Sequence, residues 1–509
     1  MSPDQGLHLL SSPSGAEWWN FVLVFVGLVA AIGLGEGVRA IFRWSPEFTR
    51  KLVHISVGVL IFFAPAIFVT AIPAIVLAVV FIVLNLLAIR LGVLKGMHGT
   101  TRPTYGTVYY PLSFLILVLV FWYHADYILS IAILVMAFAD AAAAIVGESL
   151  RRPREYYLSS DKKSVEGSVT MFAVSFAVVF IGLTYFGIAA ERGWLLVLAA
   201  SFVAALTSTA WEALSARGFD NLSVPLSTAL VLALFIYSPS ANEAVQLTVG
   251  AGLGLVIGVA SYRAGFLTVS GSVATFLLAS TIYGLGGWKW TVPILAFFVL
   301  SSLLSKTGKA RKQELSDLFE KGSTRDAGQV FANGGIAGLL AVAAFAFPGW
   351  DLYPVYLASV AGVTADTWGT EIGVMARGKT YLITSWKRVA PGVNGGVSVA
   401  GLIGGLVGSA VVVSIAAVWL SSFRAALFAC CAGFLGSVVD SLLGATLQAT
   451  YRCSVCGKVT EKRVHCREPA EIAASGSSPH LVRGLGWMNN DAVNWFCALS
   501  SALVALLLL

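Results

Sequence analysis

Three aspartates, Asp140, Asp366 and Asp440, follow long apolar runs and precede small residues. That pattern places each carboxylate near the end of a helix that is buried or embedded in a membrane. An acidic side chain there costs roughly 3 kcal/mol unless a cation or a hydrogen-bond donor meets it. The three aspartates are therefore candidates for a functional site, and the alternative is a polar residue that only packs helices together.

An ordered set of polar residues accompanies these aspartates and recurs at a spacing of roughly 225 residues. The first set is Asp140, Glu148, Lys162-Lys163, Glu166-Gly167-Ser168, Glu212 and Asp220-Asn221. The second set is Asp366, Glu371, Lys387-Arg388, Asn394-Gly395-Gly396-Val397-Ser398, Asp440 and Asn489-Asn490-Asp491. The same order twice, with weak identity, predicts two halves built on one plan.

Phosphoryl transfer from a nucleotide is the chemistry that these residue types serve. It needs Mg²⁺ between phosphate oxygens, Lys or Arg to neutralise charge, and backbone N–H groups that bind oxygens. Carboxylates and Asn suit Mg²⁺, and glycines at a helix start let a phosphate approach the N–H groups. Glycine-rich helix starts alone are weak signals, because they also serve close packing in membranes. Asp140 or Glu212 is the expected base, and the residues alone do not separate base from metal ligand.

Two further polar groups begin apolar runs. Arg50 and His54 are four residues apart, so they share one helix face, where a phosphate-binding pair and a basic membrane anchor are both open readings. The second group predicts a polar cavity rather than a lipid-facing surface, and it comprises Lys306, Lys312, Arg325, Gln329 and Asn333.

A cysteine-rich segment lies in the longest polar loop, 448–489. Cys453 and Cys456 form a Cys-x-x-Cys pair, and His465 and Cys466 follow in the same loop. These are the ligand types of a structural Zn²⁺ site. The usual spacing of a second ligand pair is missing, so His465 and Cys466 would have to bind as neighbours. A zinc site and a loop of reduced cysteines both stay open.

The composition identifies the kind of element that must position these residues. Of the 509 residues, 57% are hydrophobic and 12% are charged, with a mean hydropathy of +0.83. A soluble enzyme would carry about 25% charged residues. Six cysteines are too sparse for a disulfide-stapled secreted chain. We expect an all-α polytopic membrane protein, whose phosphate acceptor is a prenol or a lipid headgroup in the bilayer and which does not bind nucleic acid.

About sixteen apolar runs are long enough to be read as transmembrane helices, although the short ones could be tilted or fused. They cover residues 20–38, 52–70, 72–89, 107–124, 127–149, 168–189, 194–214, 223–238, 245–262, 270–284, 289–305, 329–347, 353–375, 396–420, 424–447 and 490–508.

The distribution of basic residues predicts the orientation. With the N-terminus extracytoplasmic, the loops on the cytoplasmic side hold 30 of the 33 Lys and Arg residues, and the exceptions are Arg192, Lys289 and Arg424. We therefore expect a multi-pass protein of the plasma (inner) membrane with its active sites facing the cytoplasm. The first helix is expected to be retained, because Met1–Glu17 lacks the basic region of a cleaved signal peptide.

The polar motifs of residues 20–240 resemble the phytol kinase and dolichol kinase family, whose relatives are the phosphatidate cytidylyltransferases. The motifs that carry this resemblance are Arg50 to Gly58, Asp140 to Glu148, Lys162 to Ser168, Glu212 and Asp220 to Pro225. Residues 245–509 resemble the integral membrane family that includes phytyl-phosphate kinase. Its marks are Ser305-Lys306, Gln329 to Gly335, Asp366 to Gly373, Asp440 to Gln448, the Cys-x-x-Cys segment and Asn489 to Asn494.

The two resemblances imply a prenol kinase domain at 1–243 and a prenyl-phosphate kinase domain at 244–509. Such a fusion would convert phytol or geranylgeraniol to its monophosphate and then to its diphosphate. CTP is the implied phosphate donor and Mg²⁺ the implied cofactor. The second half carries more cations near its site, which suits a substrate that is already phosphorylated.

The site residues fall into three predicted roles. The catalytic acids are Asp140, Glu212, Asp366 and Asp440. The nucleotide and phosphate ligands are Arg50, Lys51, His54, Lys162, Lys163, Gly167, Asn221, Lys306, Lys312, Arg325, Gln329, Asn333, Lys387, Asn394 and Asn490. The Mg²⁺ ligands are Asp140, Glu148, Asp220, Asp366, Glu371, Asp440 and Asp491.

Two other functions use similar parts. A nucleotidyltransferase would make a CDP-lipid with release of pyrophosphate. A lipid transporter or scramblase would also explain a repeat with glycine-rich helices. The acids gather at one predicted face instead of the midplane, which favours the enzyme. The sequence leaves open the prenol chain length, CTP against UTP or ATP, transfer of the intermediate between sites, and the oligomeric state.

Overall fold

The computed structural model describes residues 11–42, 46–91, 104–237, 240–307, 324–376, 378–453, 456–462 and 480–508. The chain divides into two compact units, Met1–Thr248 and Val249–Leu509. We call them unit 1 and unit 2. The division falls within helix α14 (Ala241–Arg263), a few residues after the boundary expected from the motifs.

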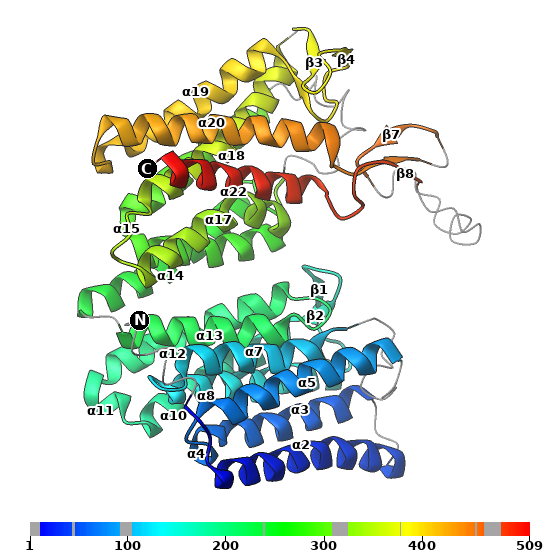
Figure 1. The fold of residues 1–509 in the computed structure, drawn as a ribbon, viewed down its shortest axis with the longest axis vertical. Helices are drawn as coiled ribbons and strands as arrows, with labels where there is room; N and C mark the ends of the chain where they lie inside the picture. Colours follow the sequence, from blue (N-terminus) through cyan, green and yellow to red (C-terminus); the bar gives the residue numbers. More distant parts are fainter. Residues whose placement is uncertain are drawn as a thin grey trace. The chain divides into compact units, whose positions relative to one another are not determined.

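Unit 1 is a helical assembly with one small hairpin (Figure 1). Its elements are α2 (Gly15–Phe42), α3 (Pro46–Phe62), α4 (Ala64–Ile67), α5 (Ala71–Leu91), α7 (Gly106–Phe121), α8 (Asp126–Leu134), the π-helical turn η1 (Val135–Asp140), α9 (Ala141–Ser149), β1 (Glu155–Tyr157), β2 (Lys162–Ser164), α10 (Val165–Tyr185), α11 (Ile188–Arg192), α12 (Trp194–Leu214) and α13 (Asp220–Tyr237). Helix α10 packs on α9 and α12, and α12 packs on α13.

Unit 2 begins with most of α14 and is built around one central helix. Its further elements are α15 (Val269–Lys306), α17 (Ala327–Ala346), α18 (Tyr353–Met375), β3 (Thr380–Leu382), β4 (Arg388–Val389), β5 (Gly396–Val397), α19 (Val399–Ala416), η2 (Ala417–Trp419), α20 (Phe423–Thr446), β6 (Thr450–Arg452), β7 (Val459–Thr460), β8 (His480–Arg483) and α22 (Asn490–Leu508). Helix α18 contacts α15, α17, α19, α20 and α22, so its polar residues lie within the unit.

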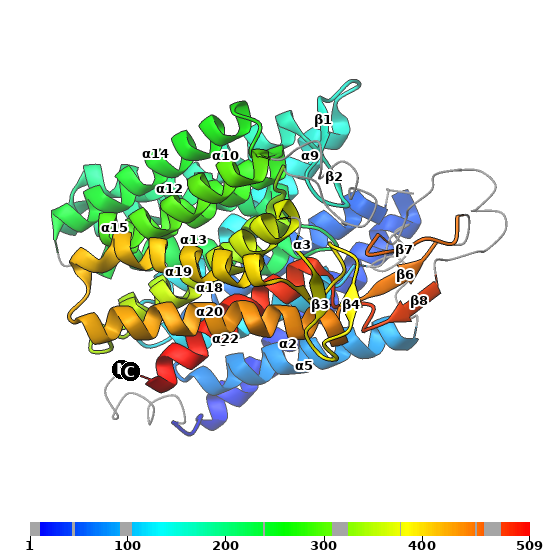
Figure 2. The same ribbon diagram turned by 90° about the horizontal axis from the view of Figure 1, so that it is seen from above.

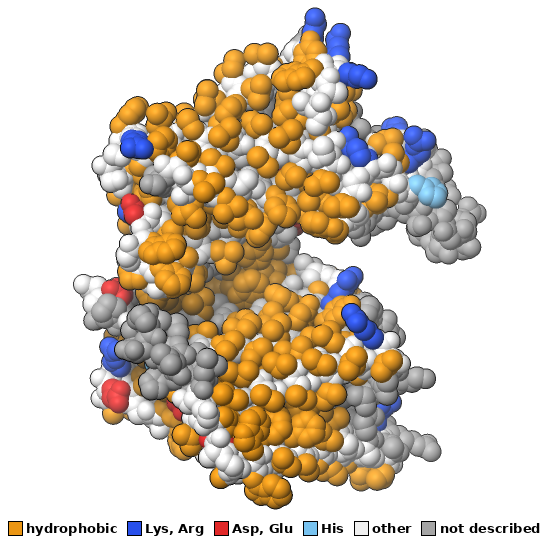
Figure 3. Space-filling view, in the orientation of Figure 1, with side chains coloured by type: hydrophobic (Ala, Val, Ile, Leu, Met, Phe, Trp, Pro, Cys, Tyr) orange, Lys and Arg blue, Asp and Glu red, His pale blue; other side chains and the backbone are white. Residues whose placement is uncertain are grey.

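The helices present their apolar side chains outward as well as inward. Orange side chains cover much of the visible surface of each unit (Figure 3), and Val26, Val256 and Ile403 are among the exposed large hydrophobic residues. Among the described residues, twelve helices are long and apolar enough to cross a membrane, and Gly106–Phe121 and Asp220–Ile236 are shorter apolar helices. The protein is therefore an integral multi-pass membrane protein, as the composition predicts.

Every apolar run predicted as a span overlaps a helix. The runs 270–284 and 289–305 both lie in α15, where Gly287 interrupts the helix with φ 58° and ψ −153°. Helix α18 has the length of a span and carries Asp366 and Glu371, but it is not among the twelve. The count of sixteen spans stays a prediction.

The polar loops contain three small antiparallel sheets, which the all-α expectation missed. They are the hairpin β1–β2, the sheet β4–β3–β5, and the sheet β7–β6–β8, which lies beyond one end of α20 and α22 (Figures 1 and 2). Their strands have two to four residues, too few for an alternating pattern to stand out in the sequence. In the described residues the membrane part is helical and the short strands lie in the loops.

A serine cap fixes how α10 meets α9 in unit 1. The Ser164 hydroxyl accepts a hydrogen bond from the N–H of Gly167 at 3.1 Å, at the start of α10. A Cβ on Gly167 would lie 3.0 Å from the carbonyl oxygen of Ala143, and one on Gly147 would lie 2.8 Å from the Ser164 hydroxyl. Only glycine allows this approach of two backbones, so α10 starts directly against the helix that follows Asp140.

The same contact occurs in unit 2. The Ser398 hydroxyl accepts from the N–H of Gly401 at 3.1 Å, and a Cβ on Gly401 would lie 2.9 Å from the carbonyl oxygen of Gly369. Gly373 follows Asp366 by the interval that separates Gly147 from Asp140. The counterpart of Gly167 is thus Gly401. The order of the motifs in the sequence instead matches Gly167 with Gly395 and Gly396, which lie before the capping serine.

Candidate active sites

The Asp140 carboxylate of unit 1 meets a lysine of the same unit. Asp140 ends the turn η1, and the Lys51 Nζ on α3 lies 2.6 Å from its Oδ2. Both side chains are less than a tenth exposed. The His54 Nε2, one turn further along α3, is 3.9 Å from the same oxygen. An ordered cation therefore balances the buried carboxylate.

A second ion pair joins the hairpin to the ends of two helices. The Lys163 Nζ on β2 lies 2.5 Å from Glu212 Oε1 and 3.6 Å from Asp220 Oδ2. Burial opposes the charged form of Lys163, but the carboxylates of Glu212 and Asp220 outweigh burial and raise the pKa of this ammonium well above its ordinary value. Asp140 also acts on Lys163 electrostatically, so the two pairs belong to one centre.

The start of α13 is held against the start of α7. Gly218 has φ 84°, and a Cβ there would lie 2.5 Å from the backbone nitrogen of Gly106. The Asn221 Nδ2 donates to the Gly218 carbonyl at 3.0 Å and to Asp220 Oδ1 at 3.1 Å. This packing fixes the orientation of Asp220 toward Lys163.

An apolar cavity of about 110 Å³ adjoins this centre. It lies among α2, α3, α5, α7 and the start of α13. Its polar lining residues are Arg50, His54, Asn85, Thr107, Tyr110 and Asn221, and the rest of the wall includes Leu28, Ile32, Val57, Ile61, Leu77, Phe81 and Phe114. Such a space suits a molecule with one polar end and a hydrocarbon chain.

Three predicted residues of unit 1 lie outside this arrangement. Lys162 forms an ion pair with Glu155 at 2.6 Å on the hairpin surface, and about half of its side chain is exposed. The N–H of Gly167 is used by the serine cap. Glu148 is exposed at the end of α9. The structure gathers Lys51, His54, Asp140, Lys163, Glu212 and Asp220 instead.

In unit 2, two acidic residues meet without a basic partner. Asp366 on α18 and Asp440 on α20 interact directly through their carboxyl groups. The Asp440 Oδ2 is buried and has no hydrogen-bond partner in the described part of the chain. No Lys or Arg among the described residues forms an ion pair with either side chain. Two neighbouring carboxyl oxygens with spare lone pairs fit a hard divalent cation such as Mg²⁺.

The other predicted acids and amides of unit 2 have separate places. Glu371 accepts a hydrogen bond from the Ser305 hydroxyl at 2.6 Å. Asn490 and Asp491 are the first residues of α22 and are partly buried. Lys387 is exposed between β3 and β4, and Asn394 lies in the turn before β5. Within the described ranges no group of three His, Cys, Asp or Glu side chains could hold a metal ion.

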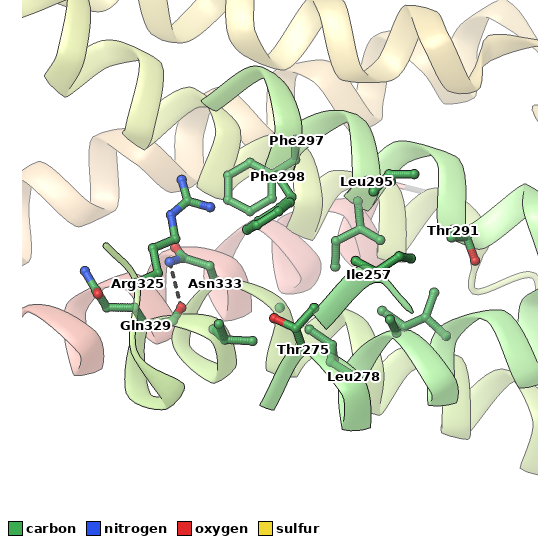
Figure 4. Close-up of a pocket in the computed structure, with 15 residues that line it drawn as sticks. Ile257, Thr275, Leu278, Thr291, Leu295, Phe297, Phe298, Arg325, Gln329 and Asn333 are labelled. Atoms are coloured by element: carbon green, nitrogen blue, oxygen red, sulfur yellow. Dashed lines mark hydrogen bonds between the residues drawn. The ribbon is translucent and has the colours of Figure 1, made fainter. Parts of the chain in front are cut away.

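A second apolar cavity, of about 70 Å³, lies among α14, α15 and α17. Figure 4 shows Arg325, Gln329 and Asn333 at one end and apolar side chains such as Leu278 and Leu295 along the rest. The Asn333 Nδ2 donates to the Gln329 carbonyl at 2.8 Å. The two residues lie at one end of a cavity whose wall is otherwise apolar, whereas the sequence predicts a polar cavity.

Arg325 is placed firmly at this cavity. Its N–H donates to the Phe266 carbonyl and its carbonyl accepts from the Thr268 N–H, both at 3.0 Å. The guanidinium carbon is 5.2 Å from the centre of the Phe297 ring and 5.6 Å from that of Phe298. Burial lowers the pKa of Arg325 to about 10, so the group stays cationic at neutral pH. Lys306 points elsewhere, to the Ala264 carbonyl at 2.9 Å.

Part of the prediction falls on residues that the structure does not describe. Lys312, His465 and Cys466 are outside the described residues, while Cys453 is buried and Cys456 is exposed. The zinc site stays a prediction.

Sequence reasoning missed Tyr110 and Thr107, which line the unit 1 cavity. Both lie in an apolar run without a charged neighbour, so no local pattern marks them. Only the packing of α7 against α3 brings Tyr110 to His54, where the ring centres are 4.7 Å apart.

Comparison with known proteins gives a family for much of the chain. Residues 252–502 match the family model described as integral membrane protein DUF92. Protein PGR of Arabidopsis thaliana is 32% identical over 47% of this chain and 88% of its own length. A phytol kinase of Synechocystis sp. is 35% identical over 43% of this chain and 94% of its own length. A probable chloroplastic phytol kinase 1 of Oryza sativa is 28% identical over 43% of this chain and 74% of its own. No solved structure shows a significant match.

Proposed function

Because this chain belongs to the family of the Synechocystis phytol kinase and matches the DUF92 membrane family over residues 252–502, we propose that it is a prenol kinase. Its substrate is a membrane-embedded prenyl alcohol such as phytol or geranylgeraniol. Unit 1 makes the monophosphate and unit 2 converts it to the diphosphate. A nucleoside triphosphate is the phosphate donor, and the resemblance of the motifs favours CTP.

The observation that carries this proposal is in unit 1, where a centre of buried acidic residues adjoins an apolar cavity with a polar end. In unit 1 the Asp140 and Lys163 centre adjoins the cavity through His54. There Lys163 would neutralise phosphate charge of the donor, and the cavity would hold the prenyl chain. Each carboxylate of this centre has a lysine partner, because Lys51 pairs with Asp140 and Lys163 is shared by Glu212 and Asp220.

Unit 2 differs in the charge of its polar end. Arg325 puts a cation at the end of the apolar cavity, and no carboxylate in the described ranges forms an ion pair with it. A guanidinium in that position suits the phosphate of a prenyl monophosphate. Asp366 and Asp440 would hold Mg²⁺, which neutralises phosphate charge when bound.

The proposal also includes the number of spans, their orientation and the zinc site. The repeated order of polar motifs supports two related halves. The apolar runs support about sixteen spans, and the basic loops support an extracytoplasmic N-terminus and cytoplasmic sites in the plasma membrane. The Cys453 and Cys456 loop would bind Zn²⁺ only together with His465 and Cys466. Homo-oligomer formation stays open to measurement.

The first test is a product assay by mass spectrometry. Purified protein in lipid nanodiscs receives geranylgeraniol, CTP and Mg²⁺, and wild type is compared with Asp140→Asn and Asp366→Asn. We expect diphosphate from the wild type, no phosphorylated product from Asp140→Asn, and accumulated monophosphate from Asp366→Asn. Each loss should exceed about 100-fold if the carboxylate acts in transfer.

The outcomes separate the rival functions. A CDP-linked product with pyrophosphate would replace the kinase by a nucleotidyltransferase. Monophosphate from Asp140→Asn would place the first step outside unit 1. No nucleotide consumption with any of several prenols, for a protein whose melting temperature is normal, would leave lipid transport as the better function.

A further inference from the structure

Several residues that line the unit 1 cavity, Thr107 among them, have a buried polar atom without a hydrogen-bond partner in the described part of the chain, and two such atoms belong to neighbouring rings. They are the Nε2 of His54 and the hydroxyl of Tyr110. Both residues line the cavity, and their rings meet edge to face with centres 4.7 Å apart. Buried polar groups are nearly always paired, so two orphans at the same end of one cavity point to a ligand.

The packing around Tyr110 holds its hydroxyl in this place. A Cβ on Gly58 of α3 would lie 3.0 Å from the Tyr110 hydroxyl and 2.4 Å from the Cβ of Ala137. Because Gly58 has no side chain, α3 can pack closely on both η1 and Tyr110 of α7. Tyr110 is only 7% exposed, so its hydroxyl has little access to solvent.

The two unpartnered atoms differ in the hydrogen bond that each can form. A neutral imidazole with its proton on Nδ1 offers Nε2 as an acceptor, and a phenol hydroxyl offers a donor. A ligand hydroxyl has one proton to donate and lone pairs to accept, so a single alcohol group would satisfy both. The wall beyond is hydrocarbon, with Ile61, Leu77 and Phe114 among its residues. We propose that His54 and Tyr110 bind the hydroxyl of the prenyl alcohol, whose chain occupies this cavity.

This inference rests on the proposed kinase function and assigns its acceptor site. It also assigns the base. Asp140 does not line the cavity, and Lys51 occupies its Oδ2 at 2.6 Å. His54 does line it and lies 3.9 Å from that same oxygen. Asp140 is thus placed to stabilise a protonated His54 rather than to meet the alcohol.

The transfer step balances with these groups. The alcohol oxygen forms a bond to the γ-phosphorus of the nucleoside triphosphate, and the bond from that phosphorus to the β–γ bridging oxygen breaks. The nucleoside diphosphate leaves with that electron pair. The alcohol proton passes to His54 Nε2, and Tyr110 keeps its own proton while it donates to the alcohol oxygen. Tyr110 is therefore a positioning residue, and His54 is the general base.

The kinetic test compares single variants of the full chain in nanodiscs, with geranylgeraniol as the varied substrate. Tyr110→Phe removes one hydroxyl, so KM should rise about three- to tenfold with kcat nearly unchanged. His54→Gln removes the base, so kcat should fall about 100-fold or more. Tyr105→Phe is the control, because it removes an exposed hydroxyl outside the cavity lining. If Tyr110→Phe and His54→Gln match Tyr105→Phe while the wild type is active, the inference is overturned.

A binding test without nucleotide separates this inference from the proposed function. Phytol is compared with phytane, the hydrocarbon of the same skeleton without the hydroxyl, by the ligand-induced rise in melting temperature. The wild type should bind phytol about tenfold more tightly, and Tyr110→Phe and His54→Gln should narrow that preference. If the two variants lose the preference for phytol over phytane although the wild type phosphorylates no prenol, the hydroxyl site is supported and the proposed kinase function fails. Equal binding of phytol and phytane by the wild type would refute the site.

Discussion

At the scale of single residues, the two units differ in what balances their acidic groups. Lys51 and Lys163 pair with Asp140 and Glu212 in unit 1, whereas Asp366 and Asp440 of unit 2 meet each other. The sequence predicts all four acids, because acids after apolar runs are conspicuous, and it predicts Lys51 and Lys163 as phosphate ligands. It did not predict who pairs with whom, because Lys51 and Asp140 are brought together only by packing of α3 on η1. Tyr110 was missed for the same reason.

The neighbouring lysines of β2 provide a matched test of the buried pair. Lys163→Met leaves Glu212 buried without a cation and should cost about 3 kcal/mol of unfolding free energy. Lys162→Met breaks only an exposed pair with Glu155, so its melting temperature should stay close to that of the wild type. Thermal unfolding of the two variants in the same nanodiscs measures the difference. Equal melting temperatures would show that Lys163 does not stabilise the centre.

At the scale of elements, one contact between two helices positions each centre. Ser164 and Ser398 cap α10 and α19. Gly167 and Gly401 let these helices pack closely on α9, which follows Asp140, and on α18, which carries Asp366. The positions of the helices follow from the apolar runs, which is why the sequence predicts them. The sequence does not predict the register of the repeat, because unit 2 has an additional strand and a longer loop before its capping serine.

Glycine to alanine substitutions measure this contact. Gly401→Ala would place a Cβ 2.9 Å from the Gly369 carbonyl oxygen, so we expect a loss of about 1 to 3 kcal/mol. Gly335→Ala is the control, since nothing lies within 4 Å of its Cβ position in α17. That variant should be neutral or slightly more stable, by up to about 1 kcal/mol. A Gly401→Ala protein that melts with the control would rule out a close contact.

At the scale of the whole molecule, composition predicts a multi-pass membrane protein, and the apolar outer surface agrees with it. The sides of the membrane follow from charge alone. The β1–β2 hairpin lies in a basic loop, with Arg151, Arg152 and Arg154 before it, so it is expected in the cytoplasm. The short helix α11 connects α10 and α12, whose other ends lead into cytoplasmic loops. We therefore expect α11 on the extracytoplasmic side.

Thiol labelling in intact cells tests this orientation. In a background with the six cysteines replaced by alanine, Ser160→Cys marks the hairpin and Glu191→Cys marks α11, and both positions are exposed. A membrane-impermeant maleimide should label Glu191→Cys in intact cells and Ser160→Cys only after lysis. The reverse pattern would invert the predicted topology.

The residue just before each capping serine has a consequence for how the two units diverged. It is Lys163 in unit 1 and Val397 in unit 2. The cap and the glycine contact are the same on either side of this exchange. The helix contact therefore does not depend on which side chain precedes the serine. The residue at this one position can set the ionic character of a centre, provided that the acids around it change with it, because a buried Glu212 without Lys163 would be costly.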